Sequence, residues 1–235
     1  MIDWQHFEKQ ISLEARQTLS SAGRLRRLLL SAIEAGALQP GSRLKETELG
    51  AELKVSRTPL REALAALKAE QILEIDENGL RVRILDWRDV SSLYELRGTL
   101  ESMAAAQAAT HASPAERQII GRICADEVQL MSVGAAPSIL ATHNRRFHSA
   151  ILQAAGNKFL TESLNQLSRL MVLLGTTAYT VDERATAIQK EHQLINQAIQ
   201  NGLSAEAESA MHTHLEQALI ARLSMLSLTN TGEID

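Results

Sequence analysis

The segment Leu49–Lys68, LGAELKVSRTPLREALAALK, places the strongest constraint on how this chain can fold. Its leucines recur at the spacing of one helical face, and Pro59 suits the first turn of a helix because its missing N–H costs little there. Either Ser56 or Thr58 can serve as the N-cap of that helix. The segment therefore predicts two short helices joined by a tight turn.

Polar side chains near the start of the second helix lie off its leucine stripe. Arg57, Thr58 and Arg61 fall on the outward side, as in the recognition helix of a helix-turn-helix. Arginine can grip guanine O6 and N7, and hydroxyl groups at a helix N-terminus suit phosphate oxygens. The alternative is that the arginines only solvate an exposed face and pair with Glu62 or Glu48.

The flanking segments complete a winged helix. Helical spacing precedes the motif over Ala22–Gly36, with the two short helices at Glu46–Leu53 and Thr58–Glu70. Two short apolar runs, residues 72–75 and 80–84, enclose a turn at residues 76–79 and predict a β-hairpin. We expect this hairpin to be the wing.

Length and composition limit the remaining choices. With 235 residues and 45% apolar residues, two domains are expected, and the 3% aromatic content favours helices over sheets. The single cysteine, Cys124, excludes an internal disulfide and a thiolate metal cluster. No leader-like or membrane-length apolar run is evident, so we expect a cytoplasmic protein without membrane contact.

The net charge of -4 is unevenly distributed. Residues 1–86 carry 13 Lys and Arg against 13 Asp and Glu, so the excess of acid lies in the remainder. A local basic face in the first part is therefore compatible with the acidic total.

From Trp87 nearly to the end, apolar residues recur at helical spacing. The pattern predicts helices at residues 90–104, 115–130, 139–155, 160–171, 185–199 and 205–226. The expected fold is mainly α, with an N-terminal winged helix-turn-helix and a C-terminal antiparallel bundle of six to seven helices. Residues 1–21 are expected to form an arm or short helix, 22–86 the winged domain, 87–228 the bundle and 229–235 a flexible tail.

The run LQPGSRLKETELGAELKVSRTPLREALAALKAEQIL, residues 38–73, closely resembles the winged-helix domain of the GntR family of bacterial transcription regulators. The resemblance implies a homodimer that binds a short palindromic operator in double-stranded DNA. It implies DNA contacts from Arg43, Lys45, Ser56, Arg57, Thr58, Arg61, Asn78 and Gly79. Gln71 stands where the family usually has glycine, and we expect it to bend that corner slightly differently.

Three histidines lie on apolar helical stripes of the second domain: His148, His192 and His214. A single histidine so placed is usually a hydrogen-bonded core residue. Neutral imidazoles that converge from three helices would instead leave lone pairs unmatched unless a metal or polar ligand accepted them.

The second half resembles the FCD ligand-binding domain of the FadR-type branch of that family. The resemblance rests on YELRGTLE (94–101), NRRFHSAI (144–151), AAGN (154–157), EHQLINQAIQNG (191–202) and MHTHL (211–215). In metal-binding members an Asp and three His hold a divalent ion, which binds a small carboxylate effector. The implied ligands are Asn144, His148, His192 and His214, with zinc expected first and nickel, iron or manganese as alternatives.

Asn144 replaces the family's aspartate at this position. An amide oxygen can ligate a metal but carries no charge, so metal affinity should fall relative to an aspartate site. Three imidazoles and an amide would leave the double charge of the ion uncompensated, which should strengthen capture of an anionic effector.

Arg97 also lies on a mostly apolar stripe, one turn before Glu101. It can pair with that glutamate or clamp an effector carboxylate. The other histidines receive no role in this interpretation: His6, His111, His143 and His212.

These features predict a ligand-responsive transcription regulator and not an enzyme. The rival interpretation is a metalloenzyme in which a histidine triad activates water. Against it, the sequence lacks HExxH and ExxH pairs, and Glu191 is expected to point off the ligand face. A third interpretation, in which the second domain only dimerises, would leave three core histidines without a purpose.

Overall fold

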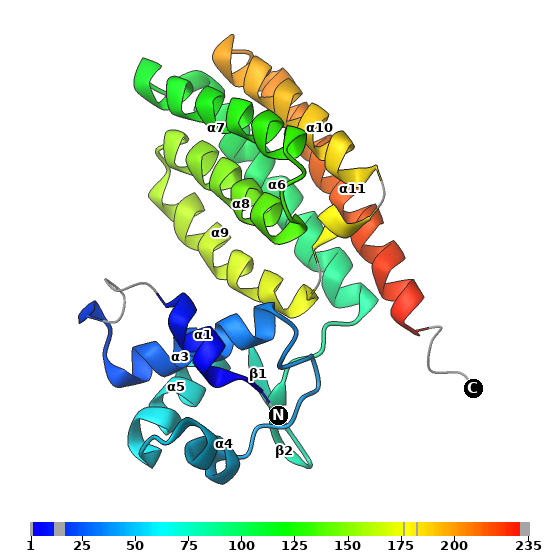
Figure 1. The fold of residues 1–235 in the computed structure, drawn as a ribbon. Helices are drawn as coiled ribbons and strands as arrows, with labels where there is room; N and C mark the ends of the chain where they lie inside the picture. Colours follow the sequence, from blue (N-terminus) through cyan, green and yellow to red (C-terminus); the bar gives the residue numbers. More distant parts are fainter. Residues whose placement is uncertain (1, 12–16, 176, 182, 231–235) are drawn as a thin grey trace. The chain divides into compact units, whose positions relative to one another are not determined.

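The computed structural model describes residues 2–11, 17–175, 177–181 and 183–230 (Figure 1). The contacts between Cα atoms divide the chain into two compact units. The first comprises Met1–Leu85 with Ser168–Thr176, and the second comprises Asp86–Leu167 with Thr177–Asp235.

The first unit is built on helix α3, Ser21–Glu34, packed against α5, Arg57–Ala69. The hydroxyl of Ser20 caps α3 by accepting the backbone N–H of Gly23 at 3.1 Å. This cap starts the helix one residue before the predicted Ala22. Buried leucines of both helices fill the interface between them, which fixes the recognition helix on a stable support.

Helices α4, Glu46–Leu53, and α5 form the predicted helix-turn-helix. Lys54 ends α4 in the left-handed conformation, with φ of 53°, and turns the chain toward α5. Ser56 is the N-cap residue of α5, but its side chain makes no capping hydrogen bond. The hydroxyl of Ser56 is thus exposed at the start of the recognition helix.

The wing is an antiparallel pair of β1, Leu73–Asp76, and β2, Gly79–Val82. Asp76 pairs with Gly79, so the turn is tighter than the predicted four residues, and Gly79 has φ of +110°. Gln71 at the preceding corner has φ of 60°. The corner therefore keeps the left-handed backbone that glycine favours, in a residue for which it is strained.

The N-terminal residues include helix α1, Trp4–Gln10. Trp4 and Phe7 of this helix and its C-cap residue Ile11 are buried. The indole N–H of Trp4 donates to Glu52 of α4 at 2.8 Å. Of the predicted arm, residues 12–16 lie outside the described residues.

Among the described residues, six α-helices form the second unit, which agrees with the predicted bundle. They are α6 Trp87–His111, α7 Pro114–Ser132, α8 Pro137–Ala154, α9 Lys158–Leu170, α10 Arg184–Gln200 and α11 Ser204–Asn230. The last residues of α9 are assigned to the first unit, together with the 3-10 helix η1, Met171–Leu174. A further 3-10 helix, η2, Ala178–Thr180, precedes α10 and was not predicted.

Local signals set several boundaries that the apolar spacing missed. Asp86 with Asp89, and Ser113 with Glu116, form capping boxes that open α6 and α7. Pro137 stands at the start of α8, which shortens the predicted linker 133–138. Helix α11 extends to Asn230, beyond the predicted start of the tail at residue 229, and residues 231–235 lie outside the described residues.

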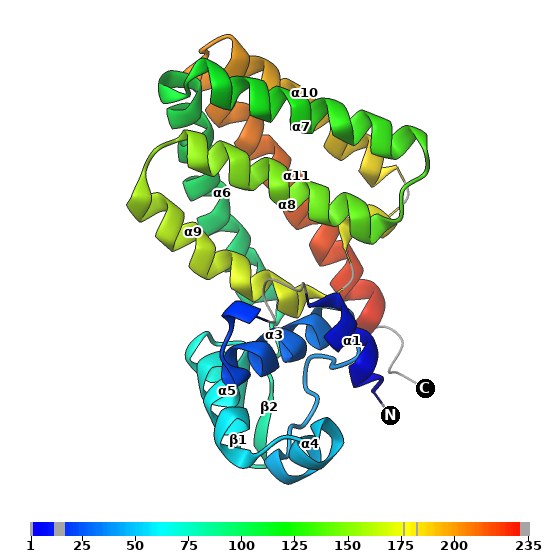
Figure 2. The ribbon, with the colours of Figure 1, turned by 60° about the vertical axis from the view of Figure 1, so that its left-hand side comes forward.

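The core of the bundle lies between α6, α7, α8, α10 and α11 (Figure 2). Helices α6 and α11 run antiparallel. Ser204 at the start of α11 donates to the carbonyl of Ala106, and His212, further along α11, lies beside Gly98, which is earlier in α6. Small alanines of α6 permit this close packing: Ala105, Ala108 and Ala109. None of the described helices is long and apolar enough to cross a lipid bilayer.

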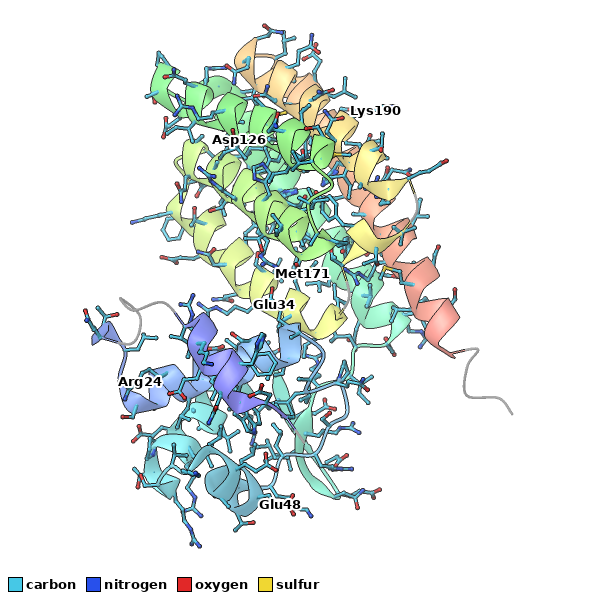
Figure 3. All side chains as sticks on the ribbon, in the orientation of Figure 1. Arg24, Glu34, Glu48, Asp126, Met171 and Lys190 are labelled. Carbon is cyan, nitrogen blue, oxygen red and sulfur yellow. The ribbon has the colours of Figure 1, made fainter. Side chains whose placement is uncertain are left out.

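Neighbouring acidic and basic residues of the bundle differ sharply in exposure. Asp126 and Lys190 lie on its outside (Figure 3), but the next residues along the chain, Glu127 and Glu191, turn inward. Glu127 is only 1% exposed. An acidic side chain buried this far needs a partner, and its partners form the site described next.

Candidate functional site

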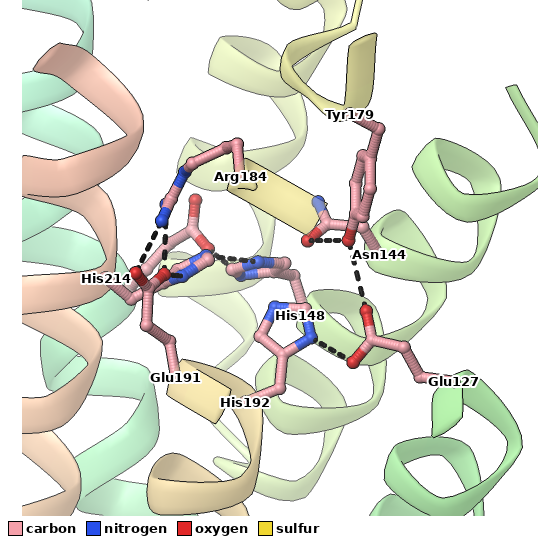
Figure 4. Close-up of polar contacts among 9 residues, drawn as sticks. Glu127, Asn144, His148, Tyr179, Arg184, Glu191, His192 and His214 are labelled. Carbon is pink, nitrogen blue, oxygen red and sulfur yellow. Dashed lines mark hydrogen bonds and ion pairs between the residues drawn. The ribbon is translucent and has the colours of Figure 1, made fainter. Parts of the chain in front are cut away.

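Three histidine rings from three helices meet inside the bundle (Figure 4). His148 comes from α8, His192 from α10 and His214 from α11. One ring nitrogen of each lies within 4.8 Å of the others, and the Nε2 atoms of His148 and His214 are 3.3 Å apart. The convergence predicted from the sequence is present in the fold.

Two of the three histidine rings are removed from solvent. His192 is fully buried and stacks on Phe147 with ring centroids 4.2 Å apart, and His214 is 3% exposed. Burial lowers the pKa of His192, although Glu127 opposes the effect. Burial and the neighbouring His192 lower the pKa of His214 well below its usual value. Both rings are therefore neutral near pH 7 and each keeps a lone pair.

Each histidine uses its Nδ1 atom to contact a different carboxylate. The Nδ1–Oε2 distances are 2.6 Å for His148 with Glu101, 2.7 Å for His192 with Glu127 and 2.6 Å for His214 with Glu191. An ionised carboxylate only accepts hydrogen bonds, so each Nδ1 carries the proton in the neutral ring. The three Nε2 lone pairs are left facing the centre of the site.

The centre of the site lacks a donor for these lone pairs among the described residues. His192 Nε2 is buried without a hydrogen-bond partner. The Nε2 atoms of His148 and His214 face each other with both protons on Nδ1. A cation between the rings would satisfy all three nitrogens at once.

The three carboxylates are held in turn by further partners. Arg97 donates to Glu101 from Nε at 2.8 Å, and Arg184 donates to Glu191 from a terminal nitrogen at 2.9 Å. Glu127 accepts the hydroxyl of Tyr179 at 3.1 Å. Every histidine thus belongs to a chain of at least two supporting groups, an arrangement typical of metal-binding histidines.

These partners also keep the buried carboxylates ionised. Burial alone would raise the pKa of Glu101, but the charge of Arg97 and the contact with His148 outweigh it and hold this pKa well below its usual range. Burial of Glu127 is likewise outweighed by its hydrogen bond to His192, so its pKa is lowered. The acids can therefore orient the imidazoles near pH 7.

Asn144 lies one turn before His148 on α8, beside Tyr179. The hydroxyl of Tyr179 is 3.1 Å from Glu127 and 3.5 Å from Oδ1 of Asn144, but its single proton can serve only one acceptor. Glu127 is closer and ionised. Turning the Asn144 amide would let its NH₂ group donate to Tyr179 and leave its oxygen for a ligand.

The geometry fits a metal ion. Two Zn–N bonds of ordinary length at a tetrahedral centre place their nitrogens about 3.4 Å apart. The observed 3.3 Å between His148 and His214 agrees with that spacing. His148, His192 and His214 thus form a cluster that could hold a divalent ion, with Asn144 adjacent.

Several supporting residues were missed or misjudged from the sequence. The expectation that Glu191 points away from the histidines is wrong, since it contacts His214. Glu127, Tyr179 and Arg184 received no role, because only the folded bundle brings them to the site. Arg97 pairs with Glu101, the first of its two interpretations.

The remaining histidine of α8 has a separate contact. His143 Nε2 lies 2.7 Å from the carbonyl of Ile123 and donates to it. His143 is therefore a hydrogen-bonded core residue, in agreement with its exclusion from the predicted ligands.

The predicted DNA-binding residues lie on the first unit, and most of the cations are paired. Arg61 contacts Glu46 at 2.7 Å, Lys45 contacts Glu48 at 2.8 Å, and Arg43 contacts Asp76. The alternative interpretation paired the recognition-helix arginines with Glu62 or Glu48, but Arg61 pairs with Glu46 instead. Intramolecular carboxylates already occupy these three cations.

The start of the recognition helix is open. Ser56, Arg57 and Thr58 are exposed, and no described residue bonds to the Arg57 guanidinium. At the wing, Asn78 is exposed, and its backbone N–H donates to Asp76 at 2.8 Å beside Gly79. Arg57 is thus free to reach a ligand without breaking an ion pair.

Comparison with known sequences identifies both units. Residues 21–81 match the family described as "Bacterial regulatory proteins, gntR family", and residues 92–217 match the "FCD domain". The chain is a GntR-family transcription regulator with an FCD domain. The family relationship makes it a DNA-binding protein, as the helix-turn-helix indicated.

Relatives of this GntR-family regulator span most of its length. The uncharacterized HTH-type transcriptional regulator YdhC of Bacillus subtilis is 27% identical and covers 76% of this chain and 80% of its own. The putative L-lactate dehydrogenase operon regulatory protein of Escherichia coli is 28% identical, covering 78% and 77%. A solved structure of E. coli McbR/YncC shares the fold, with a TM-score of 0.74, 22% identity, and coverage of 89% and 100%.

Proposed function

We propose that this regulator changes its operator affinity when a small organic acid binds in the helical unit, through a divalent metal held by Asn144, His148, His192 and His214. One observation carries the proposal: three Nε2 lone pairs, two of them on buried rings, face one centre while each Nδ1 is fixed by a carboxylate. A site of neutral, oriented imidazoles is suited to a metal and costly without one.

The bound ion would supply a positive charge that accepts a carboxylate oxygen. The surrounding residues hold the ligands in place and exclude water. Zinc suits a nitrogen-rich site of this size, with nickel, iron or manganese as alternatives. The name of one relative, which ties it to an L-lactate dehydrogenase operon, is compatible with an acid as effector.

The contacts that the nearby carboxylates already make favour binding over catalysis. A metal-activated water needs a general base beside it. Glu101, Glu127 and Glu191 each contact a histidine Nδ1 and a further donor, so their oxygens are engaged in support of the rings. We therefore propose a sensor and not an enzyme. A unit that only dimerises would not explain three converging, oriented histidines.

We further assign residues 22–86 to DNA binding and residues 87–228 to effector binding and dimerisation, in a cytoplasmic homodimer on a palindromic operator. Arg57 would read bases, while Arg43, Lys45 and Arg61 would reach DNA after exchanging their carboxylates for phosphates. Ser56, Thr58, Asn78 and Gly79 would complete the contact surface.

The test is binding of the full-length protein to DNA from its own upstream region, followed by fluorescence anisotropy at fixed salt. A panel of small carboxylates is added before and after chelation of metals. We expect one acid to shift the affinity at least about fivefold, and only in metallated protein. The variant His148→Ala should bind DNA but not respond.

A response in chelated protein and in His148→Ala as large as that of metallated wild-type protein would contradict the metal-dependent sensor. Absence of metal from purified, untagged wild-type protein after incubation with Zn²⁺ would do the same.

A further inference from the structure

We propose that the histidine site selects acids that carry a single negative charge, and that the neutral side chain of Asn144 sets this preference. The inference rests on the proposed function, since it concerns the acid that joins an ion held by the three histidines. It is carried by the charges that surround those rings and by the way in which they are already paired.

The charges around the histidines can be counted from their contacts. The groups that hold the rings comprise three carboxylates and two guanidinium groups: Glu101, Glu127, Glu191, Arg97 and Arg184. Imidazoles that ligate an ion through Nε2 and keep their proton on Nδ1 are neutral, as are the Asn144 amide and the Tyr179 phenol. Three negative and two positive charges leave this shell with one net negative charge, so a divalent ion would bring it to one net positive charge.

This count differs from the expectation based on the ligands alone. Asn144 and three imidazoles would leave both charges of the ion uncompensated. The net negative charge of the groups behind the rings compensates one of the two. With aspartate at position 144 the loaded shell would be neutral. With Asn144 it keeps one positive charge, and a buried excess charge is stabilised by one opposite charge and not by two.

A second carboxylate would meet guanidinium groups whose ion pairs already use Nε and a terminal nitrogen of Arg97 and both terminal nitrogens of Arg184. Arg97 binds Glu101 through Nε and a terminal nitrogen, at 2.8 and 2.7 Å. Arg184 binds both oxygens of Glu191 through its two terminal nitrogens. The buried Nε of Arg184 has no hydrogen-bond partner among the described residues, but a second carboxylate that reached it would place another negative charge beside Glu191. A monocarboxylate needs only the ion itself.

The experiment compares two acids of the same length that differ in one charge. Succinate and its monoamide, succinamate, are titrated into wild-type protein and Asn144→Asp, both loaded with Co²⁺. Binding is read from the visible absorption of protein-bound Co²⁺, and retention of Co²⁺ is measured in parallel because succinate also binds free metal. Control variants are His148→Ala at the site and Asp126→Asn on the outside of α7.

We expect wild-type protein to bind succinamate at least about tenfold more tightly than succinate. Asn144→Asp should bind Co²⁺ more tightly, which also shows that it folds, and should bind succinamate at least about tenfold more weakly. Asp126→Asn should behave as wild type.

Two results would overturn the inference while leaving the proposed metal site intact. One is wild-type protein that binds succinate as tightly as succinamate, and the other is an Asn144→Asp variant with unchanged succinamate affinity. Failure of wild-type protein to bind Co²⁺ more tightly than His148→Ala would overturn the proposed function and this inference together.

Discussion

The ring of His192 and the carboxylate of Glu127 form a hydrogen-bonded pair, 2.7 Å from Nδ1 to Oε2, that is almost wholly removed from solvent. The two residues lie 65 positions apart, on α10 and α7. The pair fixes which nitrogen of His192 carries the proton, and it aims the other nitrogen at His148 and His214.

Removal of this carboxylate should weaken metal binding. We expect Glu127→Ala to lower the affinity for Zn²⁺ by about 10- to 100-fold, because no carboxylate then fixes the tautomer and the orientation of the His192 ring. Glu127→Gln, which keeps an acceptor oxygen, should lose less. The measurement is competition with a chromophoric chelator.

The matched control for Glu127 is its exposed neighbour on the same helix, Asp126. Asp126→Ala should leave the Zn²⁺ affinity unchanged. Equal losses in the variants of Glu127 and Asp126 would mean that the effect arises from the helix as a whole and not from the contact with His192.

The buried rings should make the metal-free protein sensitive to acid. Because the pKa values of His192 and His214 are lowered in the folded protein, the unfolded chain binds more protons below about pH 6.5, the usual histidine value. Stability is therefore complete above that pH and declines as the pH falls through the window toward the lowered values. We expect the thermal midpoint of chelated protein to fall accordingly.

The thermal midpoint is measured by circular dichroism at several pH values, and the slope is compared between variants. His192→Gln should reduce the pH dependence, whereas His111→Gln, a change at an exposed histidine, should retain it. The same slope in all three proteins would show that other groups control the acid response.

Much of the fold is encoded in local patterns. The leucine spacing and Pro59 predicted the recognition helix to within one residue at each end, and the helical periodicity predicted six bundle helices. The three histidines could be selected because each replaces an apolar residue on a predicted inner face. Such signals depend on helix periodicity alone, which a sequence displays directly.

The supporting groups of the site could not be predicted in the same way. Glu127 lies between Asp126 and Val128, and only the packing of α7 against α10 decides that it turns inward. Glu191 is next to His192 yet serves His214 on another helix. Tyr179 belongs to a short 3-10 helix without any apolar period. These are tertiary relationships, so burial of a charge reveals them where spacing does not.

Strain at the wing corner can be relieved. Gln71 holds a left-handed backbone, with φ of 60°, where glycine would be unstrained. We expect Gln71→Gly to stabilise the protein by about 0.5 to 1 kcal/mol, since relief of strain outweighs the greater freedom of the unfolded chain. Urea unfolding followed by circular dichroism measures the change. Gln71→Ala, which keeps the strain and loses the contact with Arg83, should not stabilise.

The ion pairs on the DNA-binding face predict that removal of a cation and removal of an acid change the operator affinity in opposite directions. Arg57→Ala should weaken operator binding by about 1 to 3 kcal/mol, because this exposed arginine offers a guanidinium without an intramolecular partner among the described residues. Glu46→Gln should strengthen binding, since it releases Arg61 from a carboxylate that competes with phosphate.

The salt dependence of anisotropy titrations separates these roles. If Arg61 meets a phosphate after its release, Glu46→Gln should steepen the plot of log affinity against log salt by up to about one unit, and the control Arg122→Ala on the bundle should leave it unchanged. Weaker binding of Glu46→Gln, with Arg57→Ala equal to wild type, would mean that the Glu46–Arg61 pair itself forms the reading surface.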